Sequence, residues 1–95
     1  MKLNFEWDET KARENLKNHK ISFDEATTVF SDLFSVTIPD PDHSENEQRF
    51  IDIGTSAKGR ILVVVYIERK GNVRIISCRK ATRREQRIYE EDIPE

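Results

Sequence analysis

The chain has 95 residues, of which 36% are hydrophobic and only six are glycine or proline; this predicts one folded domain over residues 1–95 and excludes disordered, collagen-like and low-complexity chains. Its longest apolar run, Ile61 to Ile67, is far shorter than the roughly 20 residues that span a bilayer, so we expect no membrane partner. The formal net charge of −2 argues only weakly against a nucleic-acid partner, because unevenly distributed charge still creates local patches.

The N-terminal residues predict a strand and then a helix. Leu3 to Trp7 alternates apolar and polar side chains, which is typical of a half-buried strand. Asp8 is a good N-cap for a helix that runs to about His19. The apolar stripe of this helix, Ala12 and Leu16, is so narrow that most of the helix should face water or a ligand. The polar residues at this end do not resemble an export signal, and we expect a cytoplasmic protein.

A second helix and a second strand follow. Ser22 and Glu25 form a capping box, and apolar residues at helical spacing from Phe23 to Leu33 give this helix a broad apolar face. Residues 34–38 alternate as a strand, which prolines end. The acidic segment from Asp40 to Glu47 has no periodicity and predicts a loop.

Three further strands are expected over Arg49–Gly54, Arg60–Glu68 and Val73–Arg79. Short turns containing glycine join them, which predicts an antiparallel meander. The middle strand is apolar without alternation, so it should be central and covered on both faces, in part by a partner chain. The lone Cys78 cannot form an internal disulfide, and a buried structural thiol is favoured over a reactive one.

The last element is a helix that opens at a second capping box, Thr82 and Glu85, and carries Tyr89. The predicted order is therefore β-α-α-β-β-β-β-α. This order predicts an α+β fold, in which an antiparallel β-sheet has two N-terminal helices and one C-terminal helix packed mainly on one face.

Charge is concentrated near the C-terminus. From Arg69 to Arg87 there are eight Lys or Arg residues against Glu85 alone, a local excess of seven positive charges, whereas the rest of the chain carries an excess of nine negative charges. A polyanion would therefore meet the C-terminal part of the protein.

A set of short motifs occurs in order over nearly the whole chain. They are Phe5-Glu6-Trp7-Asp8-Glu9; Lys11, Asn15, Lys17 and His19; Ile21 to Ala26; Pro39 to Ser44; Arg49-Phe50; Ile53-Gly54; Ile75 to Thr82; and Arg84-Glu85. Each is unspecific alone, but together they resemble the BrnT family of toxins. Lys20 departs from the pattern, because similar sequences usually place glycine after the histidine to end the first helix.

The resemblance implies a RelE-like fold and an endoribonuclease activity that arrests translation. It also implies RNA as the substrate and neutralisation by a BrnA-type antitoxin. The ribbon-helix-helix domain of such an antitoxin binds DNA, so the toxin would meet DNA only indirectly. We expect no cofactor and no metal site, and two lone histidines do not form one.

Metal-independent RNA cleavage needs cations that stabilise the charge developing on the phosphorane. Arg79 is the first candidate, because a guanidinium binds phosphate oxygens at two points and Arg79 lies where the last strand ends. Arg49 matches the family's Arg-Phe pair and is a candidate for a second phosphate contact. The alternative for Arg49 is a surface arginine paired with the acidic loop.

Cleavage also needs an acid and a base. His19 is the best candidate because it titrates near neutral pH, although a histidine at a helix C-terminus is also explained by the helix dipole. Glu85 is a candidate base among arginines, which would keep it ionised, but its capping-box position gives a structural alternative. His43 lies between carboxylates in the acidic loop and is better explained as solvated.

The remaining candidates are cations and aromatic residues of the C-terminal segment. Lys80, Arg83, Arg84 and Arg87 form a candidate RNA-binding ridge beside Arg79. An acidic antitoxin surface would select the same residues, so the sequence does not decide between the two ligands. Tyr89 fits base stacking or core packing, with core packing favoured, and Trp7 is most simply a core residue.

Two functions follow from these candidates. The first is an endoribonuclease in which Arg79 and Arg49 bind the phosphate of the RNA and His19 or Glu85 acts as the acid or base. The second is a non-catalytic binding module that acts through heteromeric assembly and operator autoregulation with its partner. The acidic overall charge and the absence of an unambiguous base favour the second.

Overall fold

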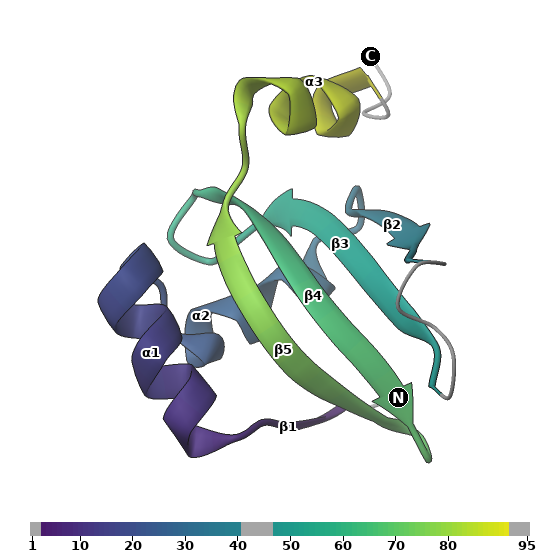
Figure 1. Cartoon of the computed structure of the whole chain (residues 1–95). Helices are drawn as coiled ribbons and strands as arrows, with labels where there is room; N and C mark the ends of the chain where they lie inside the picture. Colours follow the sequence, from purple (N-terminus) through teal and green to yellow (C-terminus); the bar gives the residue numbers. More distant parts are fainter. Residues whose placement is uncertain (1–2, 41–46, 92–95) are drawn as a thin grey trace.

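The computed structural model describes residues 3–40 and 47–91, and these form a five-stranded sheet with helices around it (Figure 1). The elements in chain order are β1 (Asn4–Glu6), α1 (Glu9–His19), α2 (Phe23–Thr28), the short 3₁₀ helix η1 (Val29–Ser31), β2 (Val36–Pro39), β3 (Arg49–Thr55), β4 (Ile61–Arg69), β5 (Asn72–Lys80) and α3 (Arg83–Glu91). The α+β class and the order of strands and helices are confirmed.

The strands lie in the order β1-β5-β4-β3-β2, so the predicted middle strand β4 is indeed central. β2 to β5 form the expected antiparallel meander. β1 joins the other edge in parallel with β5, pairing only with Asn72 to Arg74. The sheet is therefore mixed rather than wholly antiparallel as predicted. The parallel pairing of β1 with β5 is possible because the helices and the meander, which lie between these two strands in the sequence, form a long crossover connection.

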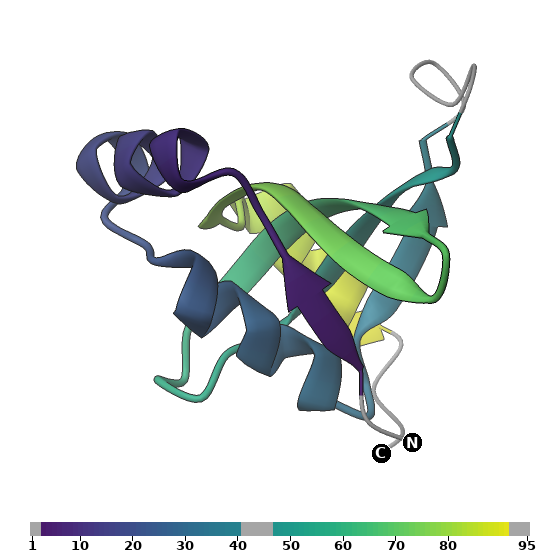
Figure 2. The same cartoon turned by 90° about the horizontal axis from the view of Figure 1, so that it is seen from below.

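The two faces of the sheet bury different side chains. On one face Leu62 and Val64 of β4 pack with Phe23 and Val29 of the α2–η1 segment. On the other face Val63 packs with Tyr89 of α3. Seen from below, α2 lies under the sheet and α1 lies beside β5, while α3 covers the opposite face (Figure 2). Both faces of β4 are thus covered, as expected, but the helices were expected mainly on one face, whereas α3 covers part of the other because Tyr89 packs against Val63 there.

Local signals in the sequence set several element boundaries. The Asp8 side chain accepts a hydrogen bond of 3.0 Å from the Lys11 backbone N–H, and Ser22 does the same for Glu25. Lys70 and Gly71 both have positive φ, of 50° and 83°, which matches the two-residue hairpin turn that joins β4 to β5.

Other predictions on the second helix and second strand were wrong. Leu33 was expected on the apolar face of the helix, but it lies beyond η1 and its side chain is 93% exposed. Phe34 was expected in the strand, but it lies in a turn where its N–H binds the Asp32 carboxylate. The helix ends early because Asp32 caps this turn instead of continuing the helix. The prediction on His43 lies outside the described residues, as does most of the acidic segment around it.

Helix α1 is fixed to the edge of β5 by the side chain of Asn15. The Asn15 amide nitrogen donates to the carbonyls of Cys78, at 2.8 Å, and Ile21, at 2.9 Å. Its oxygen accepts the Cys78 N–H at 3.0 Å. Since β1 ends its pairing at Arg74, this side chain takes the place of a neighbouring strand further along β5. Asn15 is 95% buried, so none of these backbone groups has water as an alternative.

We predict that Asn15→Ala lowers the free energy of unfolding by about 3 kcal/mol, because three buried backbone groups lose their partner. Urea denaturation followed by circular dichroism measures this. Asn18→Ala is the matched control, because Asn18 lies exposed on the same helix and should lose no stability. Equal stability of the Asn15 variant and the control would contradict the role given to Asn15.

Candidate functional site

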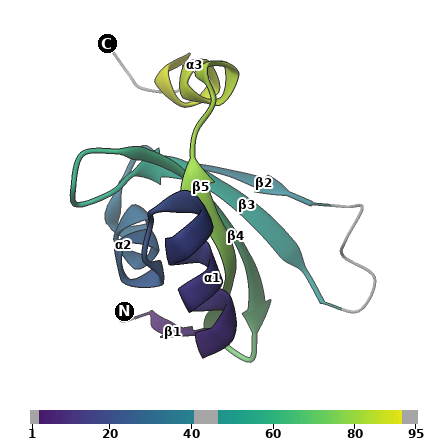
Figure 3. The same ribbon diagram turned by 60° about the vertical axis from the view of Figure 1, so that its left-hand side comes forward.

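Two of the predicted site residues lie at the same end of the molecule. His19 is the last residue of α1, and Arg79 lies near the end of β5. The C-terminal ends of these two elements lie side by side, with α3 above them (Figures 1 and 3). Arg79 pairs with Val63, whose side chain packs toward α3, so Arg79 lies on that face of the sheet. The structure therefore places Arg79 on the side that α3 only partly covers.

Arg79 is held by a bidentate ion pair with Glu85 of α3. The two guanidinium nitrogens donate to the two carboxylate oxygens at 2.7 and 2.8 Å. Of the Arg79 side chain 42% remains exposed, so the pairing with Glu85 does not bury it. Glu85 also accepts the Thr82 N–H at 2.8 Å, so the capping box forms as predicted. Capping and pairing with arginine thus occur in the same residue.

The pairing with Arg79 lowers the pKa of Glu85 to about 2, with help from the Thr82 N–H and against the effect of partial burial. The carboxylate therefore stays ionised at neutral pH, as expected for a glutamate among arginines. A carboxylate with so low a pKa is a weak base. The bidentate pairing of Glu85 with Arg79 suits Glu85 better to orienting the Arg79 guanidinium than to transferring a proton.

Arg49 lies on the same face as Arg79 but at the opposite end of the sheet. It pairs with Ile67 of β4, whereas Arg79 pairs with Val63, which separates them by about 13 Å along the strands and by two strands across. Its guanidinium lies 3.9 Å from the carboxylate of Asp40. The fold does not bring Arg49 and Arg79 together at one phosphate.

The predicted cationic ridge lies on the outer side of α3. Arg83, Arg84 and Arg87 fall within a sector of about 100° of the helix, opposite the buried Tyr89, and all three are exposed. Within the described residues none of the three has an ion pair. Lys80 pairs with Leu62, which is buried on the helix side of the sheet, so Lys80 lies on the face opposite Arg79. The ridge and Arg79 are neighbours, but they point in different directions.

Tyr89 and Cys78, for which the sequence left both a structural and a functional role open, are structural. Tyr89 is buried, its hydroxyl donates to Asp32 at 2.6 Å, and it accepts from the Thr55 hydroxyl at 3.0 Å. Cys78 is fully buried, and burial raises the pKa of its thiol to about 12. Core packing of Tyr89 and an inert thiol, the favoured predictions, are both confirmed.

His19 also lines a polar hollow that no pattern in the sequence predicted. It is about 160 Å³ in volume and lies between α1 and β5. The residues that line it are Lys11, Glu14, Asn15, Asn18, His19, Ile76 and Ser77. The spacing of three and four residues between Lys11, Glu14 and Asn18 shows that they share one side of α1, but only the fold reveals that this side meets β5.

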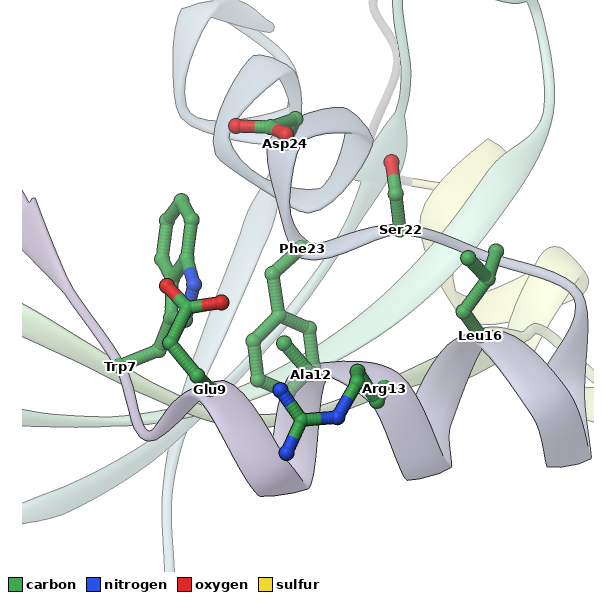
Figure 4. A pocket seen from close by; sticks show the side chains of 8 residues that line it. All are labelled: Trp7, Glu9, Ala12, Arg13, Leu16, Ser22, Phe23 and Asp24. Atoms are coloured by element: carbon green, nitrogen blue, oxygen red, sulfur yellow. The ribbon is translucent and has the colours of Figure 1, made fainter.

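The opposite side of α1 borders a different hollow, of about 230 Å³, between α1 and α2 (Figure 4). Trp7, Ala12, Leu16 and Phe23 give it an apolar lining. The Trp7 ring packs edge-on against Phe23, with 5.9 Å between ring centroids, so Trp7 belongs to the core as predicted. This hollow carries none of the predicted site residues.

Within residues 3–40 and 47–91, no three His, Cys, Asp or Glu side chains are grouped so that they would hold a metal ion. None of the helices in this part of the chain is long and apolar enough to cross a membrane.

Comparisons with known proteins agree with the resemblance. The family model described as "Ribonuclease toxin, BrnT, of type II toxin-antitoxin system" matches residues 7–85. Among solved structures, the chain is similar to the ribonuclease toxin BrnT of Brucella abortus, with a TM-score of 0.64, 21% sequence identity, and coverage of 86% of this chain and 100% of that chain. At this identity the likeness shows the fold alone. No curated protein matches the chain.

The low pKa of Glu85 gives a test of its pairing with Arg79. In the unfolded chain this carboxyl titrates near 4.5, so its stabilising contribution is complete above that pH and is lost as the pH falls toward 2. The difference in free energy of unfolding between the wild type and Glu85→Gln should therefore be largest at neutral pH and should vanish near pH 2. Urea denaturation from pH 7 to pH 2 measures it.

The Arg79→Ala background is the control, because most of the difference should disappear there. A difference that stays constant from pH 7 to pH 2 would contradict the pairing.

Proposed function

We propose that this chain, which belongs to the BrnT family of ribonuclease toxins of type II toxin–antitoxin systems, acts as a single-domain, metal-independent endoribonuclease that arrests translation in the cytoplasm. The observation that carries the proposal is the position of Arg79. Its guanidinium is oriented by Glu85, and its side chain is still 42% exposed. It lies near the end of β5, which Figure 1 shows beside the C-terminal end of α1, where His19 is the last residue. A partly exposed, fixed guanidinium at the same end of the molecule as a histidine suits a reaction at a phosphodiester.

In the proposed reaction the 2′-oxygen of the RNA attacks the adjacent phosphorus. The new 2′-O–P bond forms as the bond from phosphorus to the 5′-oxygen breaks, which leaves a 2′,3′-cyclic phosphate. Arg79 stabilises the negative charge on the phosphorane oxygens. The 2′-hydroxyl loses its proton and the leaving 5′-oxygen gains one. His19 carries out one of these transfers as general base or general acid, and water carries out the other. Glu85, the other acid or base candidate, acts as a positioning residue that holds Arg79.

Arg49 has a different role from Arg79 in this proposal. It lies on the same sheet face, but too far from Arg79 to contact the same phosphate. We propose that it contacts a more distant phosphate of the same RNA. Lys80, Arg83, Arg84 and Arg87 add attraction for the RNA backbone around the end of β5.

The binding-module function remains the second candidate, and one observation favours it. Glu85 already neutralises Arg79 through two hydrogen bonds, whereas the exposed arginines of α3 have no ion pair among the described residues. An acidic surface of a BrnA-type ribbon-helix-helix antitoxin would pair with these arginines. Contact with DNA would then arise only through the antitoxin, in operator autoregulation.

The first test is RNA cleavage by the purified protein without its partner. Wild-type protein should cleave total RNA, and Arg79→Ala should lower the rate by at least about 100-fold, because one group that stabilises the transition-state charge is removed. Arg69→Ala is the matched control, because Arg69 pairs with Glu47 at the far end of β4 and should not affect the rate. If folded wild-type protein leaves RNA intact, both alone and in a translating extract, the proposed ribonuclease function is wrong and the binding-module function is supported.

The second test concerns the arginines of α3. If they hold single-stranded RNA, Arg83→Ala should reduce the slope of log affinity against log salt concentration by about 0.7, because one phosphate contact is lost. Fluorescence anisotropy with a labelled oligoribonucleotide at several salt concentrations measures the slope. Arg69→Ala should leave the slope unchanged, and an unchanged slope for Arg83→Ala would place the RNA elsewhere.

A further inference from the structure

The polar hollow between α1 and β5 combines side chains from two elements. Glu14, Asn18 and Lys11 line it from α1, and Ile76 and Ser77 line it from β5. Ser77 pairs with Val65, which lies on the same face of the sheet as Val63 and Arg79. The hollow is therefore on the side of the sheet where the candidate active site lies, and His19 belongs to both.

Glu14 and Asn18 in this hollow differ from the glutamates that are held in salt bridges. Glu25, Glu47 and Glu85 each form a salt bridge with an arginine. In contrast, no hydrogen bond or ion pair joins the side chains of Glu14 or Asn18 to another described residue. These groups are available to a ligand without breaking an internal contact.

A break in the sheet pairing lies at the wall of the hollow. Val65 pairs with Ser77 and Tyr66 pairs with Ile75, so Ile76 is an extra residue in β5 with no partner on β4. On its other side β5 has no neighbouring strand after Arg74. The bulge thus leaves Ile76 without a strand partner on either side, at the point where it lines the hollow beside α1.

We propose that this hollow binds a guanine base of the RNA, next to the phosphate at Arg79; the inference rests on the proposed ribonuclease function. Guanine is the base that presents two adjacent N–H donors on its pairing edge, and a carboxylate such as that of Glu14 accepts both. Its neighbouring O6 is an acceptor, which Lys11 or the amide of Asn18 satisfies. Adenine and cytosine place a ring acceptor beside the amino group, and uracil has one N–H between two carbonyls.

The spacing along β5 fits this arrangement. Ser77 and Arg79 are two residues apart on one face, or about 7 Å along the strand. A phosphate at Arg79 thus places its own ribose and base near Ser77, at the opening of the hollow. The volume of about 160 Å³ suits a single planar base rather than a larger group.

The test measures binding of the four ribonucleoside 3′-monophosphates to the intact protein by NMR titration, which needs no cleavage. The guanosine nucleotide should bind about tenfold more tightly than the other three, and its amide shifts should centre on Ile76, Ser77 and Asn18. Glu14→Gln and Asn18→Ala should each remove most of this preference. Both side chains are exposed, so the variants should fold, which circular dichroism verifies.

Glu9→Gln is the matched control, because Glu9 lies on the other side of α1, at the apolar hollow of Figure 4, and should not change the preference. Equal affinity for all four nucleotides, or a guanine preference that survives Glu14→Gln, would overturn the base site even if RNA is cleaved in an Arg79-dependent way. A guanine preference lost in Glu14→Gln would support the site even if the protein cleaves no RNA, in which case the ribonuclease proposal alone would fail.

Discussion

The hydrogen bonds of the Asn15 side chain fix the position of α1, and the candidate site depends on that position. β1 leaves the edge of β5 after three residues, and Asn15 supplies the donors and acceptor that a further strand would have supplied. This contact sets the C-terminal turn of α1 level with the end of β5 (Figure 3). His19 therefore lines the same hollow as Ser77, although some 60 residues separate them in the chain.

The pairing of charges decides how much of the basic C-terminal segment remains available. Several of its arginines are already paired: Arg69 with Glu47 and Arg74 with Glu6, from other parts of the chain, and Arg79 with Glu85 of the segment itself. The local excess of positive charge in the sequence therefore overstates the charge offered to a ligand. What remains is concentrated at the start of α3 and at the end of β5.

The position of α3 is set by a small group of polar contacts rather than by a large apolar surface. The Tyr89 hydroxyl bridges Asp32 and Thr55, while Asp32 also accepts the Thr55 N–H at 2.8 Å. At this point η1 lies so close to β3 that only glycine fits at position 54. A Cβ on Gly54 would lie only 2.9 Å from the Val29 side chain. Since α3 carries Glu85, these contacts also hold Glu85 where it meets Arg79.

The sequence alone determined what depends on neighbouring residues. Asp8, Ser22 and Thr82 marked the helix starts, the alternation of residues gave the strands of the meander, and Lys70-Gly71 gave its last turn. It also identified Arg79 and His19 as candidates, and its motifs identified the family. These features follow from backbone hydrogen bonding and side-chain periodicity within a few residues, which the sequence displays directly.

Only the tertiary structure decided which groups meet. That β1 runs parallel to β5, that Glu85 neutralises Arg79 and that Arg49 lies at the far end of the face all depend on strand order and register. The hollow at Glu14 and Asn18 is bordered by a bulge at Ile76 that no local pattern marks. Contacts between distant segments are selected by the packing of the whole sheet, so the residues involved carry no signal in their own neighbourhood of the sequence.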